Sequence, residues 1–303
     1  MATKFAEGFW RLADPKISLA SAAGILLGAS AAAAAGPIAV GWLLMTVLGV
    51  FAVEVAKNAS GEVFDWDSGT DLRVREEDRS PFSGGKRVLV DGLLTRGQTW
   101  VIAAGGYLVA AVVGLLIVGF REPSVLWIGL AGMALAFFYH APPFRLAYRG
   151  LGELAVAVSY GPLVCVGTYL VQRETIPTEV VLLSLPLGVL VAAFLWINEF
   201  PDYSADALSG KRTLVVRLGR RRAALGFAWL GAISALLVAS LPMAGLSPAV
   251  WLGGVALLRY LPAARTLIAS AEDTAAIIPA QAMTLQSFLL YAAGASAGML
   301  IGR

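Results

Sequence analysis

The sequence predicts an all-α integral membrane protein with about nine transmembrane helices in one bundle, and three observations support this fold class. Of 303 residues, 58% are hydrophobic and 14% are charged, whereas soluble domains average about 45–50% and about 25%. The apolar residues form runs of about 20, the length that crosses a bilayer core of about 30 Å. Lys and Arg concentrate in alternate connecting segments. This composition excludes a soluble enzyme, a disordered chain and a nucleic-acid-binding module, and predicts one membrane domain over residues 1–303.

The elements follow from the apolar runs in chain order. Residues 1–16 mix acidic and basic side chains and lack the pattern of a cleavable signal peptide. The eighth run is the least regular, because Arg259, Pro262 and Arg265 interrupt it. The expected spans are 17–35, 38–60, 98–119, 124–141, 151–172, 178–200, 222–243, 247–267 and 281–301.

The charges also predict an orientation. The segments before the first span and after the second, fourth, sixth and eighth spans hold most of the Lys and Arg, whereas the other side has Arg121, Arg173 and Arg303. Cytoplasmic loops of membrane proteins carry the excess of basic residues. We therefore expect a multi-pass protein of a prokaryotic cytoplasmic membrane, with its N-terminus and its charged loops in the cytoplasm.

The loop expected over about 201–221 begins with an ordered acidic pattern. Asn198, Asp202 and Asp206 are spaced i, i+4 and i+8, so on a helix they share one face. Pro201 can kink such a helix without ending it. Carboxylate and amide oxygens suit Mg²⁺, which is often completed by substrate phosphates. Lys211 and Arg212 follow as candidate phosphate partners.

The loop expected over about 61–97 carries a similar pattern. Asn58, Glu62 and Asp65 would share a helical face, and a helix break at Ser68-Gly69 would reorient Asp71. Basic residues follow here too, among them Arg79 and Lys86.

A single cluster of acidic and basic residues is most often solvated surface. Two such clusters, each with Asn and carboxylates followed by bases, lie 140 residues apart, and each follows an even-numbered span. Four spans separate them, so the layout predicts two parallel four-helix halves. We expect the clusters to face each other, to hold Mg²⁺ and to bind the diphosphate of a lipid substrate. A transporter of an anionic solute is the alternative from another class, but it would place ionisable residues near the midplane.

Other polar residues have simpler interpretations. His140 is the only histidine and favours a structural role over acceptor contact. Glu54 and Lys57 lie one helical turn apart, and we expect them to pair. Glu153, early in the fifth span, could line an acceptor site.

These motifs resemble the UbiA superfamily of intramembrane prenyltransferases over roughly residues 10–300. The stretch Asn198–Gly219 is similar to that family's second Asp-rich motif. The pattern is closest to the branch that prenylates 1,4-dihydroxy-2-naphthoate in menaquinone biosynthesis. Other family-like stretches are Tyr139–Phe144, Tyr148–Glu153, Gly161-Pro162 and Gly167–Tyr169.

The resemblance implies a nine-helix bundle, Mg²⁺ as cofactor, and transfer of a polyprenyl group from an allylic diphosphate to an aromatic, lipid-soluble acceptor. Tyr139, near the reacting carbon, Asp65 and Asp202 are the implied catalytic residues. The implied metal ligands are Asp65, Asp71, Asp202, Asp206 and Glu62. The implied diphosphate-binding residues are Asn58, Asn198, Lys211, Arg212, Arg79 and Lys86.

One position departs from the family. Its first motif usually carries Asn-Asp where this chain has Gly61-Glu62, and Asn58 offers an amide one turn earlier. Within the superfamily, 4-hydroxybenzoate, chlorophyllide, carotenoid and glycerol-phosphate lipid acceptors remain alternatives to the naphthoate. The sequence indicates no oligomeric state.

Overall fold

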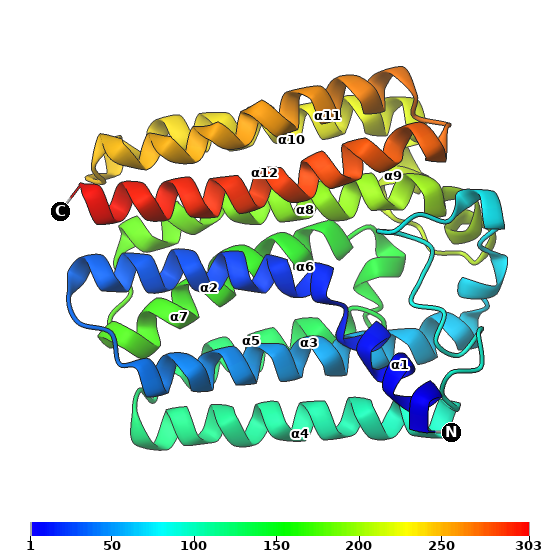
Figure 1. The fold of residues 1–303 in the computed structure, drawn as a ribbon, viewed down its shortest axis with the longest axis horizontal. Helices are drawn as coiled ribbons and strands as arrows, with labels where there is room; N and C mark the ends of the chain where they lie inside the picture. Colours follow the sequence, from blue (N-terminus) through cyan, green and yellow to red (C-terminus); the bar gives the residue numbers. More distant parts are fainter. Residues whose placement is uncertain (1, 303) are drawn as a thin grey trace.

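The computed structural model describes residues 2–302, and its long helices pack side by side with their connections at two ends (Figure 1). The all-α fold is confirmed. The α-helices are α1 (Ala2–Ala13), α2 (Pro15–Ala35), α3 (Val40–Ser68), α4 (Arg96–Phe120), α5 (Val125–Phe138), α6 (Gly152–Val158), α7 (Val164–Arg173), α8 (Thr178–Leu208), α9 (Leu214–Leu218), α10 (Arg220–Ser240), α11 (Leu257–Ala269) and α12 (Thr274–Ile301). Shorter helical turns are η1 (Asp71–Arg73), η2 (Glu76–Asp78), η3 (Leu146–Arg149), η4 (Ser159–Leu163), η5 (Leu241–Ala244) and η6 (Pro248–Ala256).

Among the described residues, seven helices are long and apolar enough to cross a membrane. One of the seven is a composite of α6, η4 and α7. Its middle part, η4, is a π-helical turn that contains Pro162. Two expected spans fall short as single helices. α5 has 14 residues. The region 247–267 divides into a 3₁₀ segment, η6, and then α11, which contains Pro262. The count of nine therefore stays a prediction.

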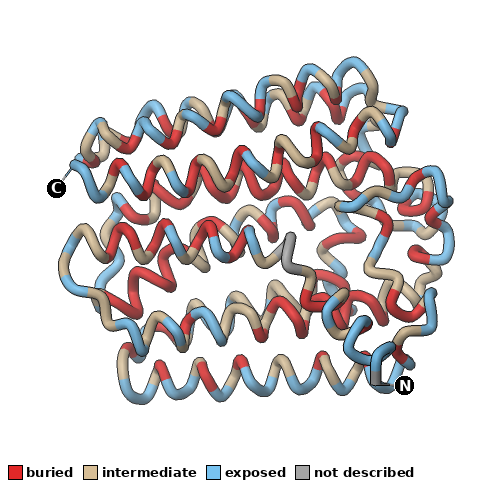
Figure 2. Tube along the Cα trace, in the orientation of Figure 1, coloured by how far each residue is buried: buried red, intermediate tan, exposed pale blue. Residues whose placement is uncertain are grey.

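Burial differs between inner and outer helices. In the apolar window of α8, 72% of residues are buried, against 22% in α4, and Figure 2 shows this contrast. Large apolar side chains, such as Leu108 and Leu115 on α4 and Trp229 on α10, are exposed. An apolar surface of this extent is costly in water and suits lipid.

The segments that follow α3, α5, α8 and α11 gather at one end of the bundle, beside α1 (Figure 1). Both acidic segments begin inside helices, so the expected loops at 61–97 and 201–221 start later than predicted. α3 continues to Ser68, where Gly69 adopts the left-handed conformation (φ 74°) and ends the helix. α8 continues through Pro201 to Leu208. Pro201 lies inside α8 and lacks the backbone N–H that would bond to the carbonyl of Ile197, yet the helix continues past it.

Candidate active site

The second acidic segment lies on the last three turns of α8, as the spacing predicts. Asn198 accepts a hydrogen bond from Nε2 of Gln281 (3.0 Å). Oδ1 of Asp202 is buried and has no hydrogen-bond partner among the described residues. Asp206 is 2% exposed. This face of α8 therefore presents one amide and two carboxyl groups to the polar end of the bundle.

Asp65 lies on the last turn of α3 and contacts residues from the α5–α6 connection. Its Oδ1 accepts a hydrogen bond from the hydroxyl of Tyr148 (2.7 Å). Its Oδ2 lies 3.6 Å from Nε2 of His140. Burial is the main cause that lowers the pKa of His140 to about 4, so the imidazole is neutral at pH 7. The sequence singled out neither Tyr148 nor His140 as a partner of Asp65.

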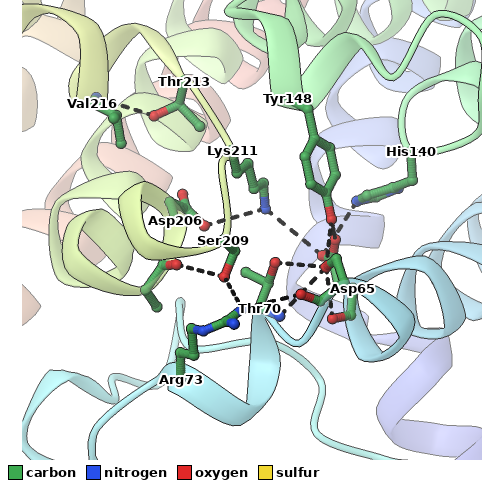
Figure 3. A network of polar contacts seen from close by, with 12 residues as sticks. Asp65, Thr70, Arg73, His140, Tyr148, Asp206, Ser209, Lys211, Thr213 and Val216 are labelled. Carbon is green, nitrogen blue, oxygen red and sulfur yellow. Dashed lines mark hydrogen bonds and ion pairs between the residues drawn. The ribbon is translucent and has the colours of Figure 1, made fainter.

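Lys211 connects the two acidic segments (Figure 3). Its Nζ lies 3.7 Å from Oδ2 of Asp65 and 3.6 Å from Oδ1 of Asp206. Burial alone would lower the pKa of Lys211, but the negative charges of Asp206 and Asp65 outweigh it and raise the pKa well above its ordinary value. A positive charge is therefore stable between these two carboxylates.

A second connection joins the ends of α3 and α8. Nη1 of Arg73 donates to the carbonyl of Ser68 (3.1 Å) and to Oγ of Ser209 (3.1 Å). The hydroxyl of Ser68 lies 2.9 Å from that of Tyr148. These contacts fix the position of the helix end that carries Asp65.

Glu62 and Asn58 make contacts that stabilise the surrounding fold. Oε1 of Glu62 accepts from the backbone N–H of Leu89 (2.8 Å), and its Oε2 is buried with no partner among the described residues. Nδ2 of Asn58 donates to the carbonyl of Leu12 (2.8 Å) and joins α1 to α3. The roles of both residues in binding stay predictions.

The remaining predicted residues differ in burial. Asp71 is 4% exposed, and burial, with the nearby charges of Asp65 and Glu62, raises its pKa to about 9. Lys86 forms an ion pair with Asp14. Arg79 and Arg212 are exposed. The binding roles of these four residues stay predictions.

Gly61 explains part of the departure from the family motif. A Cβ at this position would lie 2.6 Å from Cε1 of His140, closer than any real contact permits. A side chain at 61 would therefore displace the imidazole that lies next to Asp65.

An apolar cavity of about 440 Å³ adjoins this polar site. It follows α3 from Thr46 to Lys57, about 16 Å at 1.5 Å per residue. Tyr139, which is 8% exposed, lines it and follows α5 directly. Nζ of Lys57 lies 4.9 Å from the centre of the Tyr139 ring. The charges of Lys57 and Glu54 interact as expected, but the two side chains form no direct ion pair, and the carboxyl of Glu54 accepts a hydrogen bond from Ser21 (2.6 Å).

Within residues 2–302, no three Asp, Glu, His or Cys side chains come close enough to form a ready metal site. The donor chemistry nevertheless fits a hard divalent cation. All candidates are carboxyl or amide oxygens, Asp202 has an unpartnered buried oxygen, and the space between Asp65 and Asp206 accommodates a positive charge.

The fold and this site define a class of protein: a polytopic helical membrane protein with two carboxylate-bearing helix ends beside a lipid-sized cavity. The sequence matches the model of the UbiA prenyltransferase family over residues 21–297. The chain belongs to this family.

Several curated relatives are similar in sequence. The chain is 30% identical over 177 residues to a 2-carboxy-1,4-naphthoquinone phytyltransferase of Synechocystis sp., covering 58% of this chain and 54% of the relative. It is 25% identical over 236 residues to a 1,4-dihydroxy-2-naphthoate octaprenyltransferase of Bacillus subtilis, covering 78% and 74%. The match thus spans about half the length of the first relative and about three quarters of the second.

Solved structures share the fold. A UbiA homolog from Aeropyrum pernix K1 superposes with a TM-score of 0.67 at 16% identity, covering 96% of this chain and 97% of that one. A UbiA homolog from Archaeoglobus fulgidus bound to GPP and Mg²⁺ gives 0.58 at 14% identity, covering 95% and 99%. At these identities the similarity concerns the fold.

Proposed function

We propose that this protein transfers a polyprenyl group from an allylic prenyl diphosphate to an aromatic acceptor, and that the acceptor is 1,4-dihydroxy-2-naphthoate. The observation that carries the proposal is the position of Lys211 between Asp65 and Asp206, next to an apolar cavity. A cation-binding polar site beside a lipid-sized cavity matches a substrate with an anionic head and an isoprenoid tail. The relatives named for naphthoate and naphthoquinone prenylation support the choice of acceptor.

The proposed cofactor is Mg²⁺, held by Asp65, Asp202 and Asp206, with Asp71 and Glu62 as further candidates. When bound, it would neutralise charge on the leaving diphosphate. Lys211 and Arg212 would contact the diphosphate oxygens, together with Asn198, Asn58, Arg79 and Lys86. Tyr148 holds the Asp65 carboxylate in place through its hydroxyl.

The reacting end of the prenyl chain would lie beside Tyr139, where the cavity and the polar site meet. As the C–O bond breaks, the allylic carbon becomes positive, and the face of an aromatic ring attracts positive charge. The apolar walls exclude water, which would otherwise react with this carbon. A ring carbon of the acceptor then forms the new C–C bond, and the ring loses CO₂ or a proton.

We also propose the membrane arrangement that the charges predict. The chain would form one catalytic domain over residues 1–303 with nine spans in two parallel four-helix halves. The end of the bundle that carries Asp65 and Asp206 would face the cytoplasm of a prokaryotic cell, together with the N-terminus. The basic residues of the connections at this end support the orientation.

The direct test is prenyl transfer by the purified protein in detergent or nanodiscs. Geranylgeranyl diphosphate, Mg²⁺ and a panel of acceptors led by 1,4-dihydroxy-2-naphthoate would be supplied, with EDTA and Asp202→Asn as controls. We expect prenylated naphthoate product that both controls abolish. Transfer to another acceptor would refute the choice of acceptor, and a protein that neither binds nor consumes an allylic diphosphate would refute the reaction class.

A further inference from the structure

The charged and phenolic groups that line the apolar cavity lie at one end, whereas single hydroxyl groups such as that of Thr46 also line it elsewhere. Most lining residues are apolar, but Ser21, Glu54, Lys57, Tyr139 and Tyr160 gather where the cavity meets the polar site. They come from α2, α3, the residue after α5, and η4. Because four segments supply polar groups to the same end, this end differs chemically from the rest of the cavity.

Lys57 is the positive group of this end. It lies two turns before Asp65 on α3, and its ammonium faces the ring of Tyr139 at 4.9 Å. No carboxylate of the described residues forms an ion pair with it, and Asp65 instead contacts Lys211. An ionisable residue within a membrane span is costly and usually faces a cavity or a functional partner. The charges of Glu54 and Asp65 act on Lys57, but neither carboxylate lies within ion-pair distance, so the ammonium has a cavity and an aromatic face beside it and no carboxylate in direct contact.

Glu54 is the acceptor group of the same end. It precedes Lys57 by three residues, so both side chains project from the same face of α3. Its carboxyl accepts a hydrogen bond from Ser21 (2.6 Å), and the hydroxyls of Ser18 and Tyr160 lie close to it. A carboxyl group has several acceptor positions, so it can bind a further hydroxyl group from a ligand in the cavity.

We infer that Lys57 and Glu54 form a binding site for the acceptor, which is a hydroxylated aromatic acid. This inference rests on the proposed prenyl transfer. The ammonium of Lys57 pairs with the carboxylate of the acceptor, and Glu54 accepts a hydrogen bond from a ring hydroxyl. The aromatic ring then lies against Tyr139, beside the carbon that loses the diphosphate.

A site of this kind would bind some acceptors more tightly than others, although the proposed reaction could use any of them. A naphthalene diol without the carboxyl group offers no anion to Lys57, and a carotenoid offers neither group. A carboxylate removed from water depends strongly on a charged partner. The site should therefore discriminate between a naphthoate and the same ring without its carboxylate.

The test compares these two acceptors at saturating geranylgeranyl diphosphate. 1,4-Dihydroxy-2-naphthoate and 1,4-dihydroxynaphthalene would be assayed with the full-length protein and with Lys57→Met and Lys57→Arg. We expect Lys57→Met to raise the KM for the naphthoate at least tenfold, with little change for the diol. Lys57→Arg should restore part of the loss. Lys4→Met removes an exposed lysine of α1 and is the matched control without effect.

Two further measurements keep the outcomes distinct. Equilibrium binding of the donor reports whether Lys57→Met retains its fold and its diphosphate site, and fluorescence titration reports naphthoate binding without turnover. Equal losses for both acceptors, or weaker donor binding, would overturn the inference. Naphthoate binding that depends on Lys57 without any prenyl transfer would support the site and refute the proposed reaction.

Discussion

The two acidic segments are alike in sequence but differ in what their side chains do. In α8, Asp202 keeps an unpartnered oxygen and Asp206 contacts Lys211. In α3, Glu62 instead binds the backbone of Leu89 and Asn58 binds that of Leu12. Only Asp65 of the first segment reaches Lys211.

The contact of Glu62 with Leu89 follows from the length of the connection that the end of α3 must hold, whereas Asn58 binds α1. Residues 69–95 follow α3, whereas five residues separate α8 from α9. A long connection contains more buried backbone groups, and each of them needs a hydrogen-bond partner. The first segment therefore combines a structural role with a proposed binding role, while in the second segment Gln281 holds Asn198 and Asp202 keeps an unpartnered oxygen.

The largest expected effect separates two aspartates of the first segment. Asp65→Asn removes the charge that contacts Lys211, so we expect kcat to fall by about 100-fold or more, as for loss of a main electrostatic group. Asp67→Asn is the matched control, because Asp67 pairs with Arg96 at the exposed surface. Initial rates at saturating substrates measure both, and comparable losses would contradict the assignment.

Lys211 tests the connection between the two segments. Lys211→Met leaves Asp65 and Asp206 without their shared cation, so we expect weaker donor binding and a loss of activity of about 10- to 100-fold. Lys211→Arg should retain more activity than Lys211→Met. Arg217→Met is the control, since Arg217 contacts backbone carbonyls of Arg212 and Arg149. A donor KM unchanged in Lys211→Met would show that the lysine does not bind the diphosphate.

Two substitutions of Glu62 distinguish its structural contact with Leu89 from its proposed role in metal binding. Glu62→Ala leaves the buried N–H of Leu89 unpaired, so we expect a loss of about 1–3 kcal/mol in the free energy of unfolding. Glu62→Gln keeps an acceptor oxygen and should preserve most of this stability. Thermal unfolding in detergent measures both variants. If Glu62→Gln lowers activity as much as Asp202→Asn does, Glu62 belongs to the binding set despite its contact with Leu89.

The smallest expected effect concerns Asn58. Asn58→Ala removes the contact between α3 and α1, and one hydrogen bond contributes about 1 kcal/mol. Because Asn58 is also a proposed diphosphate contact, we expect a small decrease in thermal stability together with a modest rise in the KM for the donor. Limited proteolysis of the N-terminal helix gives a second readout of stability. An unchanged donor KM would show instead that the amide only holds α1 against α3.

Local spacing predicted the parts of this site that depend on one helix. The repeat from Asn198 to Asp206 required only the helical period, and the break after Ser68 required only the conformational preference of Gly69. The partners of Asp65 could not be predicted in this way, because Tyr148 lies 83 residues along the chain. Tertiary packing brings them together.

The same limit explains the two spans that differed from expectation. Hydropathy reports that residues 247–267 are apolar, but not that their backbone forms a 3₁₀ segment before α11. It also cannot report the end of α5 at Phe138, next to the polar connection. Composition therefore predicted the fold class, whereas helix length depended on the packing of particular segments.

The cavity lies between a polar end and lipid-facing helices, and this position has a consequence for the direction of the proposed reaction. A diphosphate released at the polar end enters water, whereas a prenylated ring remains in the hydrocarbon phase. The two products thus partition into different solvents as they leave. Reversal would require both products to return from separate phases to the same site, so this separation slows the reverse encounter, while the equilibrium itself depends on the bonds broken and formed.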